Sequence, residues 1–359
     1  SSAASDVYKR QPLKWDSDNS GRATQKAAYG LLSRVALYAE KWDVAAQAAR
    51  DCATAEGNLD LSKNGYAKIF ELGINSPEVL FAVEFKSSVI DHAYDAYVRP
   101  SGDTKELGKQ VYSGFVPTSE LVDSYEMAGD GGNFSWEKHG KDPYANREPR
   151  FYATILYNGA DWMGRKIESF VGGKDGYKAY ENAGAAGTTV TGYYLRKYLI
   201  DGDKTWVTSG SGQDWIVLRY AEVLLNKAEA LAMENWNKNS AEALQALNDV
   251  RARVGLPARA TADKETFLEY VRHERKVELA GEGFRYWDLR RWRLAEKVID
   301  GQNVHGVKIS KQSDGSFTYE QVDADGGHKR IFYDRYYRFA IPLSERSNNS
   351  LCTNNDGWI

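Results

Sequence analysis

The chain is poor in the residues that bind metals or form disulfide bonds. Its 359 residues include two cysteines, Cys52 and Cys352, and five histidines. Two cysteines near opposite ends of a chain this long make neither a disulfide framework nor a zinc pattern. The histidines show no HExxH or other metal-ligand spacing. We therefore expect no metal site and no other cofactor.

The sequence also lacks long apolar runs and a large excess of charge of either sign. No segment approaches the roughly 18–20 apolar residues that a membrane-spanning helix needs. The formal net charge is −3, so the chain has no basic footprint of the kind that marks nucleic-acid-binding proteins. We expect a globular protein that neither spans a membrane nor binds nucleic acid.

Aromatic residues, in contrast, are abundant. The chain contains 10 Trp, 23 Tyr and 12 Phe, which together make up 13% of its residues. Most of these rings must belong to hydrophobic cores. Abundant rings in a polar, loop-rich chain are also a feature of carbohydrate-binding surfaces, so glycan binding is one function class to weigh against the others.

A strongly charged segment, RHERKVELAGEGFRYWDLRRW, occupies residues 272–292. Its acidic and basic side chains share helical faces with large apolar residues such as Val271 and Phe284. Charges on a semi-buried face need partners, because burying them alone is costly. We predict an ion-pair network that ties two helices together. Its predicted members are Glu274, Arg275, Glu278, Arg285, Asp288 and Arg291.

Glu274 and Glu278 allow a second interpretation. Two carboxylates one helical turn apart resemble the catalytic pair of a glycoside hydrolase. Basic residues such as Arg275 and Arg291, however, surround them in the sequence. Guanidinium partners keep carboxylates ionised, which is wrong for a general acid. We interpret the two glutamates as architecture and expect no catalytic residues.

Periodicity predicts a mainly α-helical protein built on three helical hairpins. They cover about residues 22–55, 214–255 and 264–298. Only the first hairpin matches the tetratricopeptide pattern of a large aromatic residue, a leucine and three small residues. These positions are held by Tyr29, Leu32, Ser33, Ala45 and Cys52. Long segments without repeats separate the hairpins, so the chain is not a regular solenoid.

Residues 58–213 have a different character. The strand-like segments EVLFAVEF (78–85), RFYATILY (150–157) and GYYLRKYLI (192–200) lie among long, glycine-rich loops. Loops of this length in a compact domain are usually functional or mobile. We expect further strands and a tail in residues 299–359. The sequence therefore predicts a tetratricopeptide-like hairpin scaffold with a large, irregular binding face of loops and short strands.

Candidate ligand-binding residues lie in those loops. Proteins hold sugars by stacking them on exposed aromatic rings and by hydrogen bonds from neighbouring polar groups. The predicted ligand-binding residues are His92, Tyr94, Asp95, Tyr97, Trp136 and Trp162. Their rings stand among Gly, Asn and Asp, and we expect them near one another on the face away from the hairpins. The alternative for each ring is that it seals a loop onto the scaffold.

Several blocks of sequence together carry a family resemblance. They are NREPRFYATI (146–155), TGYYLRKY (191–198), LRYAEVLLNKAEAL (218–231), LNDVRARVGLP (247–257), the charged segment 272–292 and RFAIPLSERSNNSLCTNNDGW (338–358). In this order they resemble the SusD/RagB family of surface-exposed, nutrient-binding lipoproteins of Bacteroidetes outer membranes. The resemblance runs from about residue 22 to the C-terminus. Glu148 and Arg346 depart from the residues that are usual at those positions.

The resemblance implies a function, a location and partners. It implies non-enzymatic binding of oligosaccharide or polysaccharide at the cell surface, and delivery to a SusC-like TonB-dependent transporter of the outer membrane. It also implies that membrane contact is made only through an N-terminal lipid anchor. The alternatives are a peptide-binding RagB-type lipoprotein and, with less support from the residues, a glycoside hydrolase or a helical-repeat adaptor for protein partners.

The resemblance further implies that this chain is the C-terminal portion of a longer protein. Members of the family begin with a lipoprotein signal and a helical region. The opening residues SSAASDVYKRQ contain no initiating Met, no signal peptide and no lipobox cysteine. We expect residues 1–11 to be a leader foreign to the gene, and residues 12–359 to form a SusD/RagB-like domain.

Overall fold

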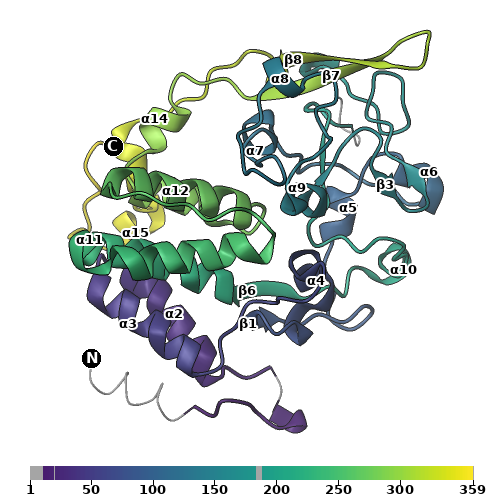
Figure 1. The fold of residues 1–359 in the computed structure, drawn as a ribbon. Helices are drawn as coiled ribbons and strands as arrows, with labels where there is room; N and C mark the ends of the chain where they lie inside the picture. The colour runs from purple at the N-terminus through teal and green to yellow at the C-terminus, as the bar shows by residue number, and fades with distance from the viewer. Residues whose placement is uncertain (1–10, 20, 183–187, 359) are drawn as a thin grey trace.

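A computed structural model of the protein describes residues 11–19, 21–182 and 188–358. The predicted leader lies almost entirely outside these residues. Figure 1 shows a stack of long helices on one side and, on the other, a half made of loops, short helices and two-stranded sheets. The predicted mainly α-helical scaffold with an irregular face is confirmed. Among the described helices, none is long and apolar enough to cross a membrane.

The first hairpin consists of α2 (Gln25–Tyr38) and α3 (Trp42–Thr54). Thr24 caps α2, because its hydroxyl accepts a hydrogen bond from the Ala27 amide. Glu40 turns the chain between the helices with a left-handed φ of 56°. Small buried side chains allow α3 to approach α2 closely. These are Ala45, Ala46, Ala48, Ala49 and Cys52.

The helices α11 (Tyr220–Arg253) and α12 (Lys264–Glu278) complete the stack. α11 is 34 residues long, and Asn235 leaves the helical region with φ −165° and ψ 96°. This residue marks the break that the sequence predicts between the two helices of the second hairpin. Asp263 caps α12 by accepting a hydrogen bond from the Thr266 amide at 2.8 Å.

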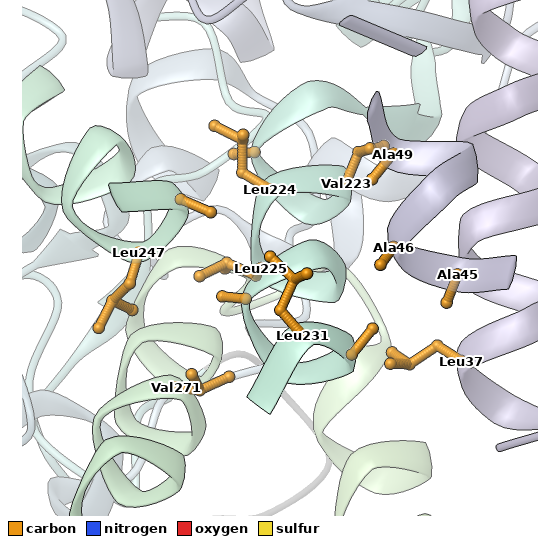
Figure 2. Close-up of a cluster of buried hydrophobic side chains, with 14 of the residues drawn as sticks. Leu37, Ala45, Ala46, Ala49, Val223, Leu224, Leu225, Leu231, Leu247 and Val271 are labelled. Atoms are coloured by element: carbon orange, nitrogen blue, oxygen red, sulfur yellow. The ribbon is translucent and has the colours of Figure 1, made fainter. Parts of the chain in front are cut away.

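The main hydrophobic core lies between these helices (Figure 2). Leu37 of α2 and the alanines of α3 approach the first part of α11 from one side. Leu247, from the second part of α11, and Val271 of α12 lie on the other side. The burial of apolar surface here supplies the main driving force for folding. The residues labelled in the figure are Leu37, Ala45, Ala46, Ala49, Val223, Leu224, Leu225, Leu231, Leu247 and Val271.

The predicted third hairpin continues from α12 into α13 (Phe284–Arg291) and α14 (Ala295–Ile299). Gly281 and Gly283 separate α12 from α13, with φ of 76° and 85°. Residues with a side chain rarely adopt such left-handed angles, so two glycines end one helix and redirect the chain into the next.

The other half of the molecule is built from short elements. Its helices are α4 (Gly65–Leu72), α5 (Tyr94–Val98), α6 (Asp103–Leu107), α7 (Ser119–Val122), α8 (Trp136–His139), α9 (Pro149–Thr154) and α10 (Trp206–Ser209). Its antiparallel strand pairs are β1 (Val79–Val83) with β6 (Trp215–Arg219), β2 (Ile155–Leu156) with β5 (Tyr194–Leu195), β3 (Asp161–Trp162) with β4 (Arg165–Lys166), and β7 (His305–Lys311) with β8 (Phe317–Asp323). The remaining elements are η1 (Ser17–Asn19), η2 (Gly73–Asn75), η3 (Tyr180–Asn182), η4 (Asp334–Tyr337) and α15 (Leu343–Asn348).

Three segments differ from the secondary structure that the sequence predicts. Of the strand-like GYYLRKYLI, only Tyr194 and Leu195 pair, as β5. Most of the strand-like RFYATILY forms α9 instead, and only Ile155 and Leu156 pair as β2. Pro149 favours this helix, because its fixed φ suits the first turn. Residues 215–219, expected to begin a helix, form β6 because they pair with β1. In residues 215–219 pairing with a distant strand decides the conformation, whereas in RFYATILY the local signal of Pro149 does so.

Gly192 is a position where the fold requires glycine. Its φ is 77°, and an added Cβ would lie 2.3 Å from the backbone oxygen of Val307 in β7. We predict that Gly192→Ala lowers the free energy of unfolding by about 3 kcal/mol, from left-handed strain and overpacking together. Gly164 is the matched control, since its φ is 73° but no atom lies within 4 Å of its added Cβ.

The control variant Gly164→Ala has only the strain of the backbone and should cost about 1 kcal/mol. Urea unfolding of both variants, followed by circular dichroism, measures the difference. Equal losses in the two variants would contradict the close approach of the Gly192 segment to β7.

Candidate functional site

Trp162 and Asp95, two predicted ligand-binding residues, are buried. Trp162 is 0% exposed, and its indole Nε1 donates to Asp103 at 3.0 Å. Asp95 accepts a hydrogen bond from Arg99 Nε at 2.8 Å. The buried Arg99 guanidinium needs carboxylate partners and lies over the indole ring, 5.2 Å from its centroid. The expectation that Trp162 exposes its ring is therefore wrong.

Tyr94 and His92 hold their loop against β6 and the loops that precede it. The Tyr94 hydroxyl donates to the backbone oxygen of Lys197 at 2.9 Å, and its ring packs 5.9 Å from that of Trp215. Burial raises the pKa of the Tyr94 hydroxyl. His92 Nε2 lies 2.8 Å from the backbone oxygen of Gln213. Both rings therefore pack a loop in place, which is the alternative to ligand binding that the sequence analysis considered for each ring.

Tyr97 is the predicted ring with an exposed face. It is 47% exposed and stacks on Tyr112, which is 45% exposed, with 5.1 Å between the ring centroids. Phe115, which follows closely in the chain, is also exposed. The backbone fixes this arrangement, because the amides of Tyr112 and Gly114 donate to the oxygens of Ala96 and Tyr97.

Trp136 lies in a different part of the molecule. Figure 1 places α8 beside β8, whereas α5, which carries Tyr97, lies well apart from both. The Trp136 indole donates to Asp123 at 2.9 Å and packs 6.3 Å from the ring of Tyr319 in β8. The predicted aromatic residues therefore do not form one surface. Trp136 nevertheless borders a group of rings that the sequence reasoning missed.

Five aromatic side chains line a shallow depression of about 390 Å³, here called the tyrosine pocket. They are Tyr144, Tyr152, Tyr157, Phe317 and Tyr319. The centroid of the Tyr144 ring lies 4.6 Å from that of Tyr157 and 5.6 Å from that of Tyr319. The Tyr152 hydroxyl donates to the backbone oxygen of Tyr144 at 2.7 Å. Residues from α9, β8 and two loops thus line one depression.

Polar groups stand beside these rings. Asp142 is exposed at the rim, and Asn158 is 7% exposed. The side-chain oxygen of Asn158 is buried and has no hydrogen-bond partner among the described residues. Rings flanked by a carboxylate and an amide can stack on the C–H face of a sugar and bind its hydroxyls.

The sequence held one signal for this pocket. Tyr144, Tyr152 and Tyr157 are closely spaced around the NREPRFYATI block, and Phe317 and Tyr319 alternate along β8. Alternation places both β8 rings on one face of the strand. The sequence does not reveal which face of β8 packs against the three tyrosines, because that depends on tertiary structure.

The ion-pair network is centred on Glu278 of α12. Its carboxylate accepts hydrogen bonds from Arg219 at 2.6 Å, from Arg150 at 2.9 Å and from Arg253. These arginines belong to β6, α9 and α11. None of the four side chains is more than 1% exposed. One carboxylate therefore joins the ends of three consecutive elements, β6, α11 and α12, to the distant helix α9.

Glu274 extends the network by one helical turn. It accepts hydrogen bonds from Arg150 at 2.5 Å and from Arg251 at 3.0 Å. Arg251 also binds Glu126 at 2.9 Å, which ties α11 to the loop half. Glu274 and Glu278 thus share Arg150, and both carboxylates are fully engaged.

A second cluster joins α11, α12 and α13. Asp288 accepts from Arg275 and Arg291, each at 2.8 Å, and Arg291 also binds Glu229 at 2.5 Å. The structure therefore joins five of the six predicted network residues. Arg285 is the exception, because it has no ion pair or hydrogen bond in the described part of the chain. The prediction for Arg285 is wrong, since the other two arginines already occupy Asp288.

The sequence reasoning missed most partners of the network. They are Glu78, Glu126, Glu148, Arg150, Lys197, Arg219, Glu229, Arg251, Arg253 and Glu282. A charged residue inside an apolar, strand-like segment, such as Arg219 in WIVLR, was the available signal. Such a residue must find a buried counter-charge.

The electrostatics of Glu278 exclude a role as a general acid. Burial acts to raise the pKa of its carboxyl, but Arg253, Arg219 and Arg150 outweigh burial and hold that pKa well below its ordinary value. A general acid must carry a proton near the operating pH. The arrangement supports our interpretation of Glu274 and Glu278 as architecture. The part of the chain that the structure describes also contains no group of three or more metal-ligating side chains.

We predict that Glu278→Gln lowers the free energy of unfolding by about 3–5 kcal/mol, because it leaves buried guanidinium groups without a counter-charge. Glu242→Gln is the matched control. Glu242 binds Arg50 and Lys227, but its side chain is 38% exposed, so its loss should cost about 1 kcal/mol or less. Chemical denaturation of both variants tests this. A Glu278→Gln protein as stable as the wild type would contradict an architectural role.

The same network predicts the response to acid. Because the pKa of folded Glu278 is depressed, its contribution to stability is complete above the unfolded value of about 4.3 and is lost as pH falls toward the folded value. The free energy of unfolding of the wild type should fall steeply below about pH 4.5. In Glu278→Gln the slope should be shallower. Parallel slopes in denaturation curves from pH 2 to 6 would contradict this.

Comparison with known proteins shows the family of the chain. The model of the SusD family matches residues 77–358. SusD-like protein P38 of Formosa agariphila is 32% identical over 133 residues, which cover 34% of this chain and 25% of the relative. A SusD-like protein of Bacteroides ovatus is 24% identical over 335 residues, which cover 87% of this chain and 55% of the relative. The chain thus spans about half or less of these curated relatives.

Solved structures show the same fold. A SusD-like protein from Bacteroides fragilis superimposes with a TM-score of 0.81 and 26% identity, covering 99% of this chain and 70% of the other. A structure described as a SusD-like carbohydrate binding protein from the same species gives a TM-score of 0.79 and 25% identity, covering 97% and 69%. With its charged motif, hairpin stack and matched residues, the chain belongs to the SusD family.

Proposed function

We propose that the chain binds a glycan at the tyrosine pocket and performs no chemistry on it. The observation that carries this proposal is the meeting of five aromatic rings with Asp142 and Asn158 in one open depression. Rings offer stacking surfaces for sugars, and the buried Asn158 oxygen offers a hydrogen-bond acceptor for a hydroxyl. The description of one Bacteroides fragilis relative as carbohydrate binding supports the same class of ligand.

The absence of catalysis in this proposal rests on the carboxylates. Glycoside hydrolysis needs two carboxyl groups beside the scissile bond, one of them protonated. Asp142 is the one carboxylate among the residues that line the tyrosine pocket. Glu274 and Glu278 are buried and held by guanidinium groups on several sides. Neither arrangement supplies an acid and a base to one ligand.

The proposal also places the protein in nutrient uptake. Family membership supports a role at the outer surface of the outer membrane, with a lipid anchor on the full-length protein. It likewise supports delivery of the bound glycan to a SusC-like TonB-dependent transporter. Peptide binding of the RagB type is the competing function, and the aromatic lining of the pocket favours sugar over peptide.

We predict that Tyr319→Ala weakens glycan binding about ten- to a hundredfold, because stacking on one ring contributes about 1–3 kcal/mol. Thr318→Ala is the matched control, since Thr318 neighbours Tyr319 on β8 but points to the opposite, exposed face. A glycan array on the wild type identifies the ligand, and calorimetry compares the variants. Tyr97→Ala, measured in parallel, tests the exposed Tyr97–Tyr112 pair as a separate contact.

Three outcomes would contradict the proposal. One is equal affinity of Tyr319→Ala and wild type at matched melting temperatures. Another is binding to peptides with no binding to any glycan on the array, which would favour the RagB-type function. The third is release of smaller sugars from the bound glycan by homogeneous protein, abolished by a single carboxylate substitution, which would favour a hydrolase.

A further inference from the structure

A second cavity lies where the helical stack meets the loop half. It has a volume of about 450 Å³ and is lined by residues of α7, of the C-terminal end of α12, and of α13 and α14. In Figure 1, α12 belongs to the stack, α14 lies beside it, and α7 lies toward the strands β7 and β8. The tyrosine pocket shares none of its lining residues with this cavity. An inference about it is therefore independent of the proposed glycan site.

Three cationic side chains line this cavity: Lys276, Arg285 and Arg330. None of them pairs with a carboxylate within 4 Å in the described part of the chain. The Lys276 ammonium donates to the backbone oxygen of Glu120 and to the Ser124 hydroxyl. The Nε atom of Arg330 is buried without a hydrogen-bond partner among the described residues. These unpaired cations contrast with the arginines of the Glu278 network, each of which binds a carboxylate.

The neighbouring carboxylates are engaged elsewhere. Glu120 lines the cavity, but it binds His305 Nδ1 at 2.5 Å and the His305 amide at 3.1 Å. Asp123 accepts from Trp136, and Asp288 is held by two arginines of the network. The cavity therefore keeps an excess of positive charge in a partly desolvated setting, where burial lowers the pKa of Arg285. Such an excess is costly unless an anion occupies the cavity.

The remaining wall is apolar. Leu279, Leu289 and Ile299 contribute aliphatic side chains to the lining. We infer that this cavity binds an organic carboxylate, with its charged group at Arg285, Lys276 and Arg330 and its apolar body against these aliphatic residues. A guanidinium group matches a carboxylate through two parallel hydrogen bonds. The volume lies within the range of small-molecule sites, and the apolar wall favours an organic ligand over an inorganic anion.

Hexanoate is a suitable probe, because it joins a carboxylate to an aliphatic body. Calorimetry or NMR titration of the whole chain should show saturable binding of hexanoate at pH 7.5. Hexan-1-ol, which lacks the charge, and inorganic phosphate, which lacks the apolar body, should bind at least tenfold more weakly. No saturable binding of hexanoate would overturn the inference. Equal binding of phosphate would overturn it as well, because the cavity would then be only an anion site.

Arg285→Gln tests the charged end of the cavity. It should weaken hexanoate binding about ten- to a hundredfold, because it removes a charge-assisted hydrogen bond. The melting temperature should stay the same or rise, because the variant removes an unpaired, partly buried charge. Arg293→Gln is the matched control, since Arg293 lies two residues beyond α13 with its side chain 61% exposed. Unchanged affinity in Arg285→Gln would overturn the inference.

The pH profile gives a readout that packing alone would not change. Burial and the nearby Arg285 lower the pKa of Lys276 to about 8, against the opposing effect of Glu120 and Asp123. Hexanoate stays ionised throughout this range. The charged groups that face Lys276 are Arg285, Asp123 and Glu120, which binds His305. Affinity should therefore fall as pH rises from 7.5 to 9.5. A flat profile over this range would overturn the assignment of Lys276 to the site.

Discussion

The rest of the structure depends on the burial of Glu278 among three guanidinium groups. An ion removed from water is strongly destabilising unless counter-charges and hydrogen bonds replace the lost hydration. Arg150, Arg219 and Arg253 can provide this replacement only if α9, β6 and α11 converge on the end of α12. The network thus restricts the fold to arrangements in which β6, α11 and α12 meet the distant helix α9 at one point. A hydrophobic core of the same size is less selective about which segments it joins.

The position of the tyrosine pocket follows from this constraint. α9 is anchored through Arg150, which Glu148 also binds at 2.6 Å. The two residues after Arg150 have different positions: Phe151 packs in a hydrophobic core, and Tyr152 lines the tyrosine pocket. Tyr157 then follows directly after β2. A binding wall built on loops is therefore held in place by the same ion pairs that fix the scaffold.

The charged motif contains two kinds of arginine that look alike in the sequence. Arg275 has a carboxylate partner at 2.8 Å, whereas Arg285 lines a cavity without one. Asp288, the acidic residue that follows Arg285 in α13, is held by Arg275 and Arg291 instead. Paired cations stabilise the fold, and an unpaired cation beside an apolar wall favours a ligand of opposite charge.

The sequence by itself determined the helical scaffold, because apolar periodicity along α2, α3, α11 and α12 depends only on local order. It also determined that Glu274, Glu278 and Asp288 need buried partners, since charges on apolar stripes cannot stay unpaired. Tertiary structure alone decided which arginines supply those partners, and whether a ring in a loop is exposed or buried. Trp162 and Tyr97 have similar polar neighbours in the sequence, yet Asp103 and Arg99 enclose Trp162, while Tyr97 stacks on the exposed ring of Tyr112. That outcome depends on contacts between distant residues, which no local pattern encodes.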